Sequence, residues 1–283
     1  MGIGSTITMG FLSPDGSWQA ISAVNPIPVG GVTASGAGVL QLATGEPVPT
    51  DPVPESGTFI VRTDPAPEPL AVVAESLTTF GSASAAAINV PYPDDIVTGD
   101  LLVACVVTNS QSATLTAPAG WELMQQQTIT GDFRECGIYG YVVDGVPPTG
   151  TANFTSNESN RIAACMFRVT GASLEEPVLV AGGPGSRNTT VYTVPALVGS
   201  AGGLIISMTQ GNSSSPNNPD PLAFSNALTQ LAYVPSEADT GVTRTWVNVR
   251  YMLASVELAS FTVTSPSSVA SMGSEVLAIR GTA

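Results

Sequence analysis

The sequence has no histidine and no lysine, and only 11% of its 283 residues are charged. Without histidine there is no Ser-His-Asp or Cys-His nucleophile, no imidazole base and no histidine-ligated zinc. Without lysine there is no P-loop lysine, no Schiff base and no kinase-type phosphate clamp. Composition therefore excludes most common enzyme classes.

Positive charge is also scarce. All eight basic residues are arginines, against 22 acidic residues, and the formal net charge is −14. Nucleic-acid backbones and anionic membranes are bound by basic surfaces, so we expect neither as a partner. The N-terminus has no secretory pattern, and the longest clean apolar run, 101–107, is too short to span a bilayer.

Cysteine is limited to Cys105, Cys136 and Cys165. Each lies in an apolar, strand-like run, and their spacing forms neither a CxxC pair nor a disulfide framework. Buried free cysteine behaves as a small hydrophobic residue. We therefore expect three structural thiols, with no metal site and no cofactor.

Short runs rich in Val, Ile, Thr and aromatic residues alternate with 23 prolines and 29 glycines, and no window shows helical periodicity. This pattern predicts an all-β protein. The run 101–107 is apolar at every position, as expected for a central strand covered on both faces.

Three regions differ in composition. Residues 1–44 carry hairpin signals, with strands at 7–12 and 18–21 around the turn Pro14-Asp15-Gly16. Residues 45–70 form a Pro-rich linker around a short strand at 58–62, for which a disordered acidic tail is the alternative. Residues 71–283 contain regularly spaced strands and form the main domain.

An internal repeat relates residues 88–171 to residues 190–283. Five pairs of segments match in the same order: Val90-Pro91 with Val194-Pro195, 99–102 with 202–205, 141–143 with 251–253, 152–155 with 259–262, and 167–171 with 277–281. We predict a jelly-roll-like antiparallel β-sandwich built from two similar halves. Two separate small sandwiches are the alternative.

Few residues offer chemistry. Paired carboxylates, as in glycosidases, occur at Asp94-Asp95, Asp132 with Glu135, and Glu175-Glu176. Adjacent strand residues point to opposite faces, so 94–95 and 175–176 are better read as solvated loop charges, and no catalytic residue is predicted.

The strand 244–253 places Arg244, Trp246 and Arg250 on one face. A tryptophan flanked by arginines is typical of an interface anchor, so these three residues are our candidate exposed contact face. Cation–π packing within the chain is the alternative.

Three phrases in the first repeat resemble a known family: GDLLVACVVTNSQSATLTAPAGWELMQQQ, GIYGYVVDG and TANFTSNESNRIAACMFRVTGA. They are similar to the β-sandwich domain of minor tail proteins and of head decoration or fibre proteins of tailed bacteriophages. The likeness covers 88–171 well and 190–283 through the repeat. It implies a structural or adhesive role and transfers no active-site residue.

Residues 15–21 and 25–29 resemble the N-terminal attachment segments of phage head-fibre proteins. The resemblance implies attachment to the virion through Phe11, Trp18, Ile27 and Val29, with the major capsid or tail protein as partner. It further implies a location on the virion surface and a homo-oligomer, with a trimer expected. A carbohydrate-binding host-receptor module is the alternative function, and a polysaccharide depolymerase is the third.

Overall fold

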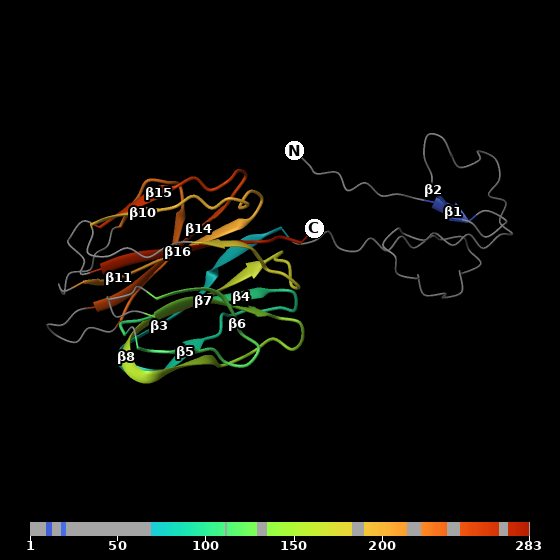
Figure 1. Ribbon diagram of the computed structural model, residues 1–283. Helices are drawn as coiled ribbons and strands as arrows, with labels where there is room; N and C mark the ends of the chain where they lie inside the picture. The colour runs from blue at the N-terminus through green and yellow to red at the C-terminus, as the bar shows by residue number, and fades with distance from the viewer. Residues whose placement is uncertain are drawn as a thin grey trace. The chain divides into compact units, whose positions relative to one another are not determined.

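The computed structural model describes residues 10–12, 18–20, 69–110, 112–128, 135–182, 190–213, 222–236, 244–265 and 271–282 (Figure 1). The chain divides into two units, 1–65 and 66–283. Within the described ranges every regular element is a β-strand. No helix in these ranges is long and apolar enough to cross a membrane.

The first unit contains a two-stranded hairpin. Strands β1 (Gly10–Leu12) and β2 (Trp18–Ala20) pair antiparallel, with Leu12 opposite Trp18. The predicted hairpin is therefore confirmed. Of the proposed attachment residues, Phe11 and Trp18 lie in these strands, whereas Ile27, Val29 and the expected strand 58–62 lie outside the described residues.

The first half of the second unit is an antiparallel sheet in the order β3-β8-β4-β7-β6, with β5 attached to β8. All of its strand pairings are antiparallel. Its strands are β3 (Ala71–Pro91), β4 (Leu101–Thr108), β5 (Leu115–Thr116), β6 (Glu122–Thr128), β7 (Glu135–Val142) and β8 (Thr151–Thr170).

The second half contains two sheets, β13-β14-β11-β16-β9 and β10-β15-β12. All of their pairings are antiparallel. Their strands are β9 (Val178–Gly182), β10 (Val191–Val194), β11 (Leu204–Ser213), β12 (Ala223–Phe224), β13 (Thr229–Pro235), β14 (Arg244–Leu253), β15 (Phe261–Thr264) and β16 (Ser271–Ile279).

Two long strands give the first half the same layers as the second. Strands β3 and β8 run for 21 and 20 residues, and their pairing shifts register three times. Such irregularities let a strand bend, and Figure 1 shows β8 curving through a wide arc. The segments 87–91 and 151–156 thereby join β5 in a three-stranded layer, the counterpart of β10-β15-β12.

The two halves repeat local geometry as well as strand order. Gly99 and Gly202 both have positive φ, at 98° and 81°, just before β4 and β11. Gly99 N donates to Val143 O at 2.8 Å, and Gly202 N donates to Ala254 O at 2.7 Å. A β-bulge follows at the same place in β6 and β13. The predicted repeat is confirmed.

Two of the five matched pairs shift. With Phe154 and Phe261 equivalent, Val194, which lies opposite Phe261, corresponds to Ile88 and not to Val90. The match of 141–143 with 251–253 shifts by one residue. Tyr141 lies opposite Leu102 in β4, whereas the residue opposite Ile205 in β11 is Met252. Met252, and not Tyr251, is therefore the structural equivalent of Tyr141.

The largest core lies between the two five-stranded sheets. Alternate residues of β4 and β11, such as Leu101, Cys105, Leu204 and Met208, meet there with side chains of β7, β8, β13, β14 and β16. We call this the shared core. The opposite face of each sheet is covered by its own three-stranded layer, so all of β4 is buried, as the sequence predicted.

The unit is thus an all-β antiparallel sandwich whose layers follow the order three, five, five and three strands. Each half is a small sandwich, and the halves pack through their larger sheets. The alternative of two separate small sandwiches matches the layers of each half. The two halves are not separate, however, because the shared core joins them in one compact unit. The jelly-roll likeness stays a prediction.

Gly211 tests the packing of the second half. It lies opposite Trp246, and a Cβ atom there would come within 2.0 Å of the indole Cζ2. Gly211→Ala should lower the free energy of unfolding by about 1 to 3 kcal/mol, because the buried ring must shift. The control is Gly145→Ala, where no heavy atom lies within 4 Å. Urea unfolding measures both, and equal stabilities of the two variants would contradict the packing.

Candidate functional site

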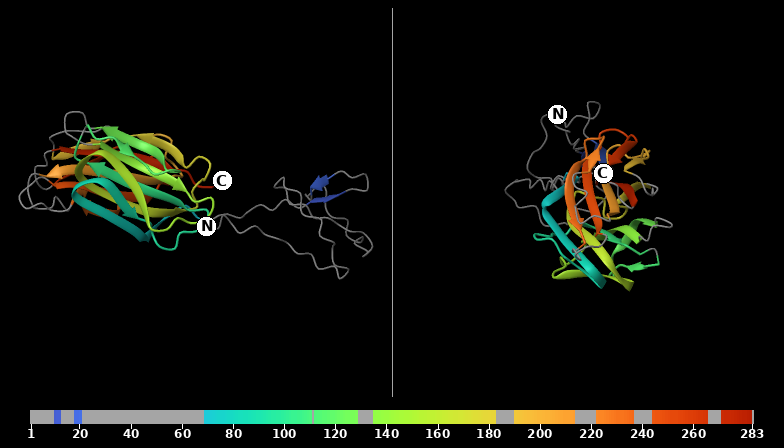
Figure 2. Two further views of the ribbon diagram at one scale, coloured as in Figure 1. Left: turned by 90° about the horizontal axis from the view of Figure 1, so that it is seen from below. Right: turned by 90° about the vertical axis from the view of Figure 1, so that its left-hand side faces the viewer.

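The compact unit has two distinct ends. Strands β3, β4 and β11 begin at one of them, where β8 and β16 finish: Ala71 lies opposite Thr170, Leu101 opposite Val169 and Leu204 opposite Ile279. A bridge between Ala172 and Gly281 joins the halves there. We call this the entry end, because the chain both enters and leaves the unit there; Figure 2 (left) shows the strands running lengthwise from it.

The entry end carries the loops 92–100, 117–121, 143–150, 171–177, 195–203 and 254–260. The opposite end carries residues 109–110 and 112–114 and the part of β8 at 156–161, which lies between its two paired segments. Residues 129–134, 183–189, 214–221, 237–243 and 266–270 lie outside the described residues.

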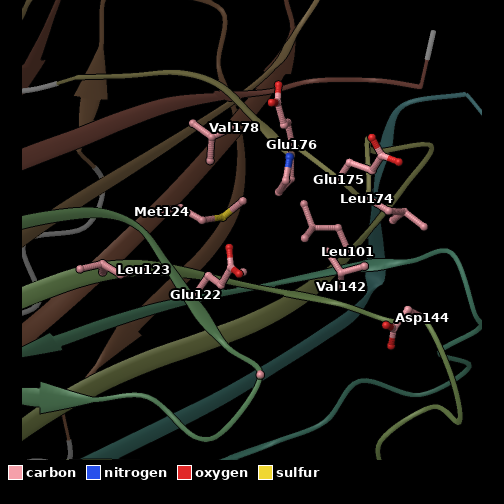
Figure 3. Close-up of a pocket in the computed structure, with 13 residues that line it drawn as sticks. Leu101, Glu122, Leu123, Met124, Val142, Asp144, Leu174, Glu175, Glu176 and Val178 are labelled. Carbon is pink, nitrogen blue, oxygen red and sulfur yellow. The ribbon is translucent and has the colours of Figure 1, made fainter.

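A groove of about 650 Å³ opens at the entry end, between β6 and the segment 174–178. In Figure 3, Leu101 and Val142 lie in its middle, with Met124 and Glu122 on one side and Leu174 and Glu175 on the other. Its lining residues are Leu101, Gly120, Glu122, Leu123, Met124, Gly140, Val142, Asp144, Leu174, Glu175, Glu176, Pro177 and Val178.

The local sequence explains the shape of the groove wall. The β-bulge between Leu123 and Gln125 sets Met124 apart from the regular ladder. Met124 lies across Gly140, where a Cβ atom would stand 2.8 Å from the sulfur. A larger residue at position 140 would therefore displace Met124 and change the wall.

The groove is negatively charged and partly apolar. Glu122, Asp144, Glu175 and Glu176 are all exposed, and so is Leu123, at 47%. Arg280 is the cation that the described residues place against this set, with Nη1 3.0 Å from Glu176 Oε2. The carboxylates outnumber that cation, so the groove attracts positive groups.

The second half of the repeat offers an internal comparison. By strand register, Thr229 and Gln230 of β13 occupy the positions of Glu122 and Leu123 in β6. Val72 lies opposite Val169, and Val178 lies opposite Ile279, which is the equivalent of Val169 in the repeat. Leu70 and Glu176, each two residues earlier, therefore occupy equivalent positions, and Leu70 packs on the shared core. The acidic residues Glu122 and Glu176 of the groove are thus replaced by uncharged residues at the equivalent place of the repeat.

The structure corrects the expected contact face of β14. Trp246 is fully buried, and its ring stacks on Tyr233 with centroids 6.0 Å apart. Arg250 is half-buried and lies over the ring of Phe224, 3.9 Å from its centroid. The side chain of Arg244 lies outside the described residues. The prediction of an exposed Trp246 is therefore wrong, because the layer β10-β15-β12 covers this face.

The other carboxylates flagged by sequence are separate from the groove. Asp94 and Asp95 are exposed and line a cavity of about 280 Å³ that also includes Tyr92. Asp132 and the side chain of Glu135 lie outside the described residues. Within the described part of the chain, no three or more Cys, Asp or Glu side chains are grouped so as to hold a metal ion.

Sequence reasoning missed the role of Asp100, which sits at the turn before β4. This carboxylate is buried, its Oδ2 accepts a hydrogen bond from Val97 N at 2.8 Å, and Arg168 Nε lies 3.0 Å away. Asp100 thus fixes the turn and ties it to β8. Its place directly after the left-handed Gly99 was the available signal.

A polar group inside the shared core was also missed. The Cys136 thiol donates to Glu275 Oε1 at 2.9 Å, and Gln210 Nε2 donates to the Cys136 sulfur at 3.0 Å. All three residues are fully buried. Glu275 occupies the position of Cys165 in the repeat, as the register of β16 and β8 shows.

The three cysteines are buried and free, as predicted. Cys105 lies opposite Cys165 in the β4–β8 pair. A hydrogen bond with Cys165, together with burial, raises the pKa of the Cys105 thiol well above its usual value. These thiols belong to the packing of the shared core.

Comparison of the chain with protein-family models, curated proteins and solved structures gives no match. Function therefore has to be argued from the fold and the groove.

Thiol reactivity tests this part of the structure. Because a raised pKa keeps the Cys105 thiol protonated at the mildly alkaline pH of a labelling reaction, and because all three thiols are buried, native protein should react slowly with an aromatic disulfide reagent. Unfolding in denaturant should then expose three reactive thiols. Rapid labelling of native Cys105 or Cys165 would contradict the assigned strand faces.

Proposed function

We propose that the chain is a non-enzymatic structural protein of a tailed-bacteriophage virion. In this proposal residues 1–65 attach to the major capsid or tail protein, and the sandwich of residues 66–283 projects outward. The observation that carries it is the two-ended layout of the sandwich. The first and last strands of the sandwich start and finish at one end, so that end carries the connection to residues 1–65 and the opposite end does not.

The phage-like phrases support the proposal because they coincide with residues that determine the fold. Gly99 and Asp100 form the turn before β4. Trp121 is buried against Phe154 and Tyr141, and Gly171 takes positive φ after β8. The resemblance is therefore to a structural plan, which fits a structural role.

A hydrolytic function has less support. A glycosidase needs one carboxyl group held protonated by an apolar enclosure, opposite a second carboxylate. The groove carboxylates Glu122, Asp144, Glu175 and Glu176 are all exposed instead.

A carbohydrate-binding adhesion module is the second candidate. The cavity beside Tyr92 favours it, because an aromatic ring next to Asp94 and Asp95 can stack on a sugar while carboxylates accept its hydroxyl hydrogen bonds. Glycan-array binding that is lost in Tyr92→Ala would support this candidate.

Attachment can be tested with phage particles that lack the protein. The full chain should co-sediment with them, whereas residues 66–283 should fold and stay in the supernatant, because the attachment segment has been removed. Trp18→Ala in the full chain should weaken co-sedimentation. The fold of residues 66–283 should stay unchanged in this variant. Equal co-sedimentation of the truncated and full chains would overturn the assignment of residues 1–65.

A further inference from the structure

Exposed apolar side chains gather at the entry end. Eight large hydrophobic side chains are exposed in the described part of the molecule, and all but Val191 belong to strand ends or loops of this end. Those at the entry end are Val97, Leu123, Val146, Leu174, Val198, Leu253 and Val256. Such gathering on one face marks an interaction surface better than scattered exposure does.

The same end is strongly negative. Its exposed carboxylates are Asp94, Asp95, Glu122, Asp144, Glu175, Glu176 and Glu257. Of the arginines described there, Arg168 is committed to Asp100 and Arg280 to Glu176. A partner for this face must therefore combine apolar contacts with positive charge.

We propose that the entry-end groove binds an extended, cationic and apolar segment of another polypeptide. Leu123, Met124 and Leu174 would take its apolar side chains, and Glu122, Glu175 and Glu176 would face its basic ones. That the partner is a virion protein rests on the proposed function. The chemistry of binding follows from the groove alone.

Charge excludes the other occupants. A second copy of this chain would bring the same carboxylates to the face. Residues 1–65 contain five acidic residues, Asp15, Glu46, Asp51, Glu55 and Asp64, against the single Arg62. Nucleic acids and anionic lipids are repelled in the same way.

The groove, and not merely the charged end, is the site for two reasons. Among the described residues β6 is the last strand of its sheet, and its residues Glu122 to Met124 line the groove, so an extended segment in the groove would run beside a sheet edge. The equivalent place in the other half has neutral Thr229 and Gln230 and is closed by Leu70. Glu176 is exposed and contacts Arg280, whereas its counterpart Leu70 is partly buried against the shared core.

The experiment uses the full chain and a fluorescently labelled peptide of alternating lysine and leucine. Fluorescence anisotropy should show saturable binding that weakens with salt. The triple variant Glu122→Gln, Glu175→Gln, Glu176→Gln should bind about tenfold more weakly, because three carboxylates that face the lysines of the peptide lose their charge. The matched variant Asp94→Asn, Asp95→Asn, Glu257→Gln removes as many charges from the same end and should bind within about twofold of the wild type.

Leucine contacts are tested in the same assay. Leu123→Ala should weaken binding several-fold, whereas Val97→Ala, an aliphatic position outside the groove that is 48% exposed against 47% for Leu123, should not. Circular dichroism checks that the variants fold, as expected for changes at exposed side chains.

Three results would overturn the proposal: no saturable binding, equal binding of a glutamate–leucine peptide, or equal loss in the two triple variants, which would show attraction by net charge alone. Peptide binding without particle binding by the full chain would leave the groove standing and overturn the virion assignment. Particle binding without peptide binding would support the virion assignment and overturn the groove as a peptide site.

Discussion

Burial of two apolar sheet faces against each other is the constraint on which the rest of the structure depends. Each five-stranded sheet has one face covered by its own three-stranded layer, so its other face can leave water only by packing on the other half. This explains why a duplicated small sandwich forms one compact unit, and why β4 and β11 are among the most buried strands.

The shared core also sets the polarity on which the functional proposals rest. It aligns the starts of β4 and β11, and the bridge between Ala172 and Gly281 lies at the same end, which also carries seven exposed carboxylates, six of them in loops and Glu122 at the start of β6. The groove opens where the edge of the shared core is not closed by an apolar side chain, with Glu176 in place of a counterpart of Leu70.

Much of the fold could be predicted because alternation and turn residues are local signals. The apolar run 101–107, the repeat at Gly99 and Gly202, and the buried cysteines followed from them. Alternation cannot show whether a third layer covers a polar-looking face, so Trp246 was misplaced. The groove and the buried Glu275 depend on contacts between segments far apart in sequence, for which the chain carries no local signal.

Native-state hydrogen exchange tests the central claim, that the shared core makes the two halves one cooperative unit. The slowest amides of β4 (Leu101–Thr108) and of β11 (Leu204–Ser213) should exchange with the same free energy of opening, equal to that of global unfolding. If one half opened at a clearly lower free energy while the other stayed protected, the halves would be independent sandwiches and the account would be contradicted.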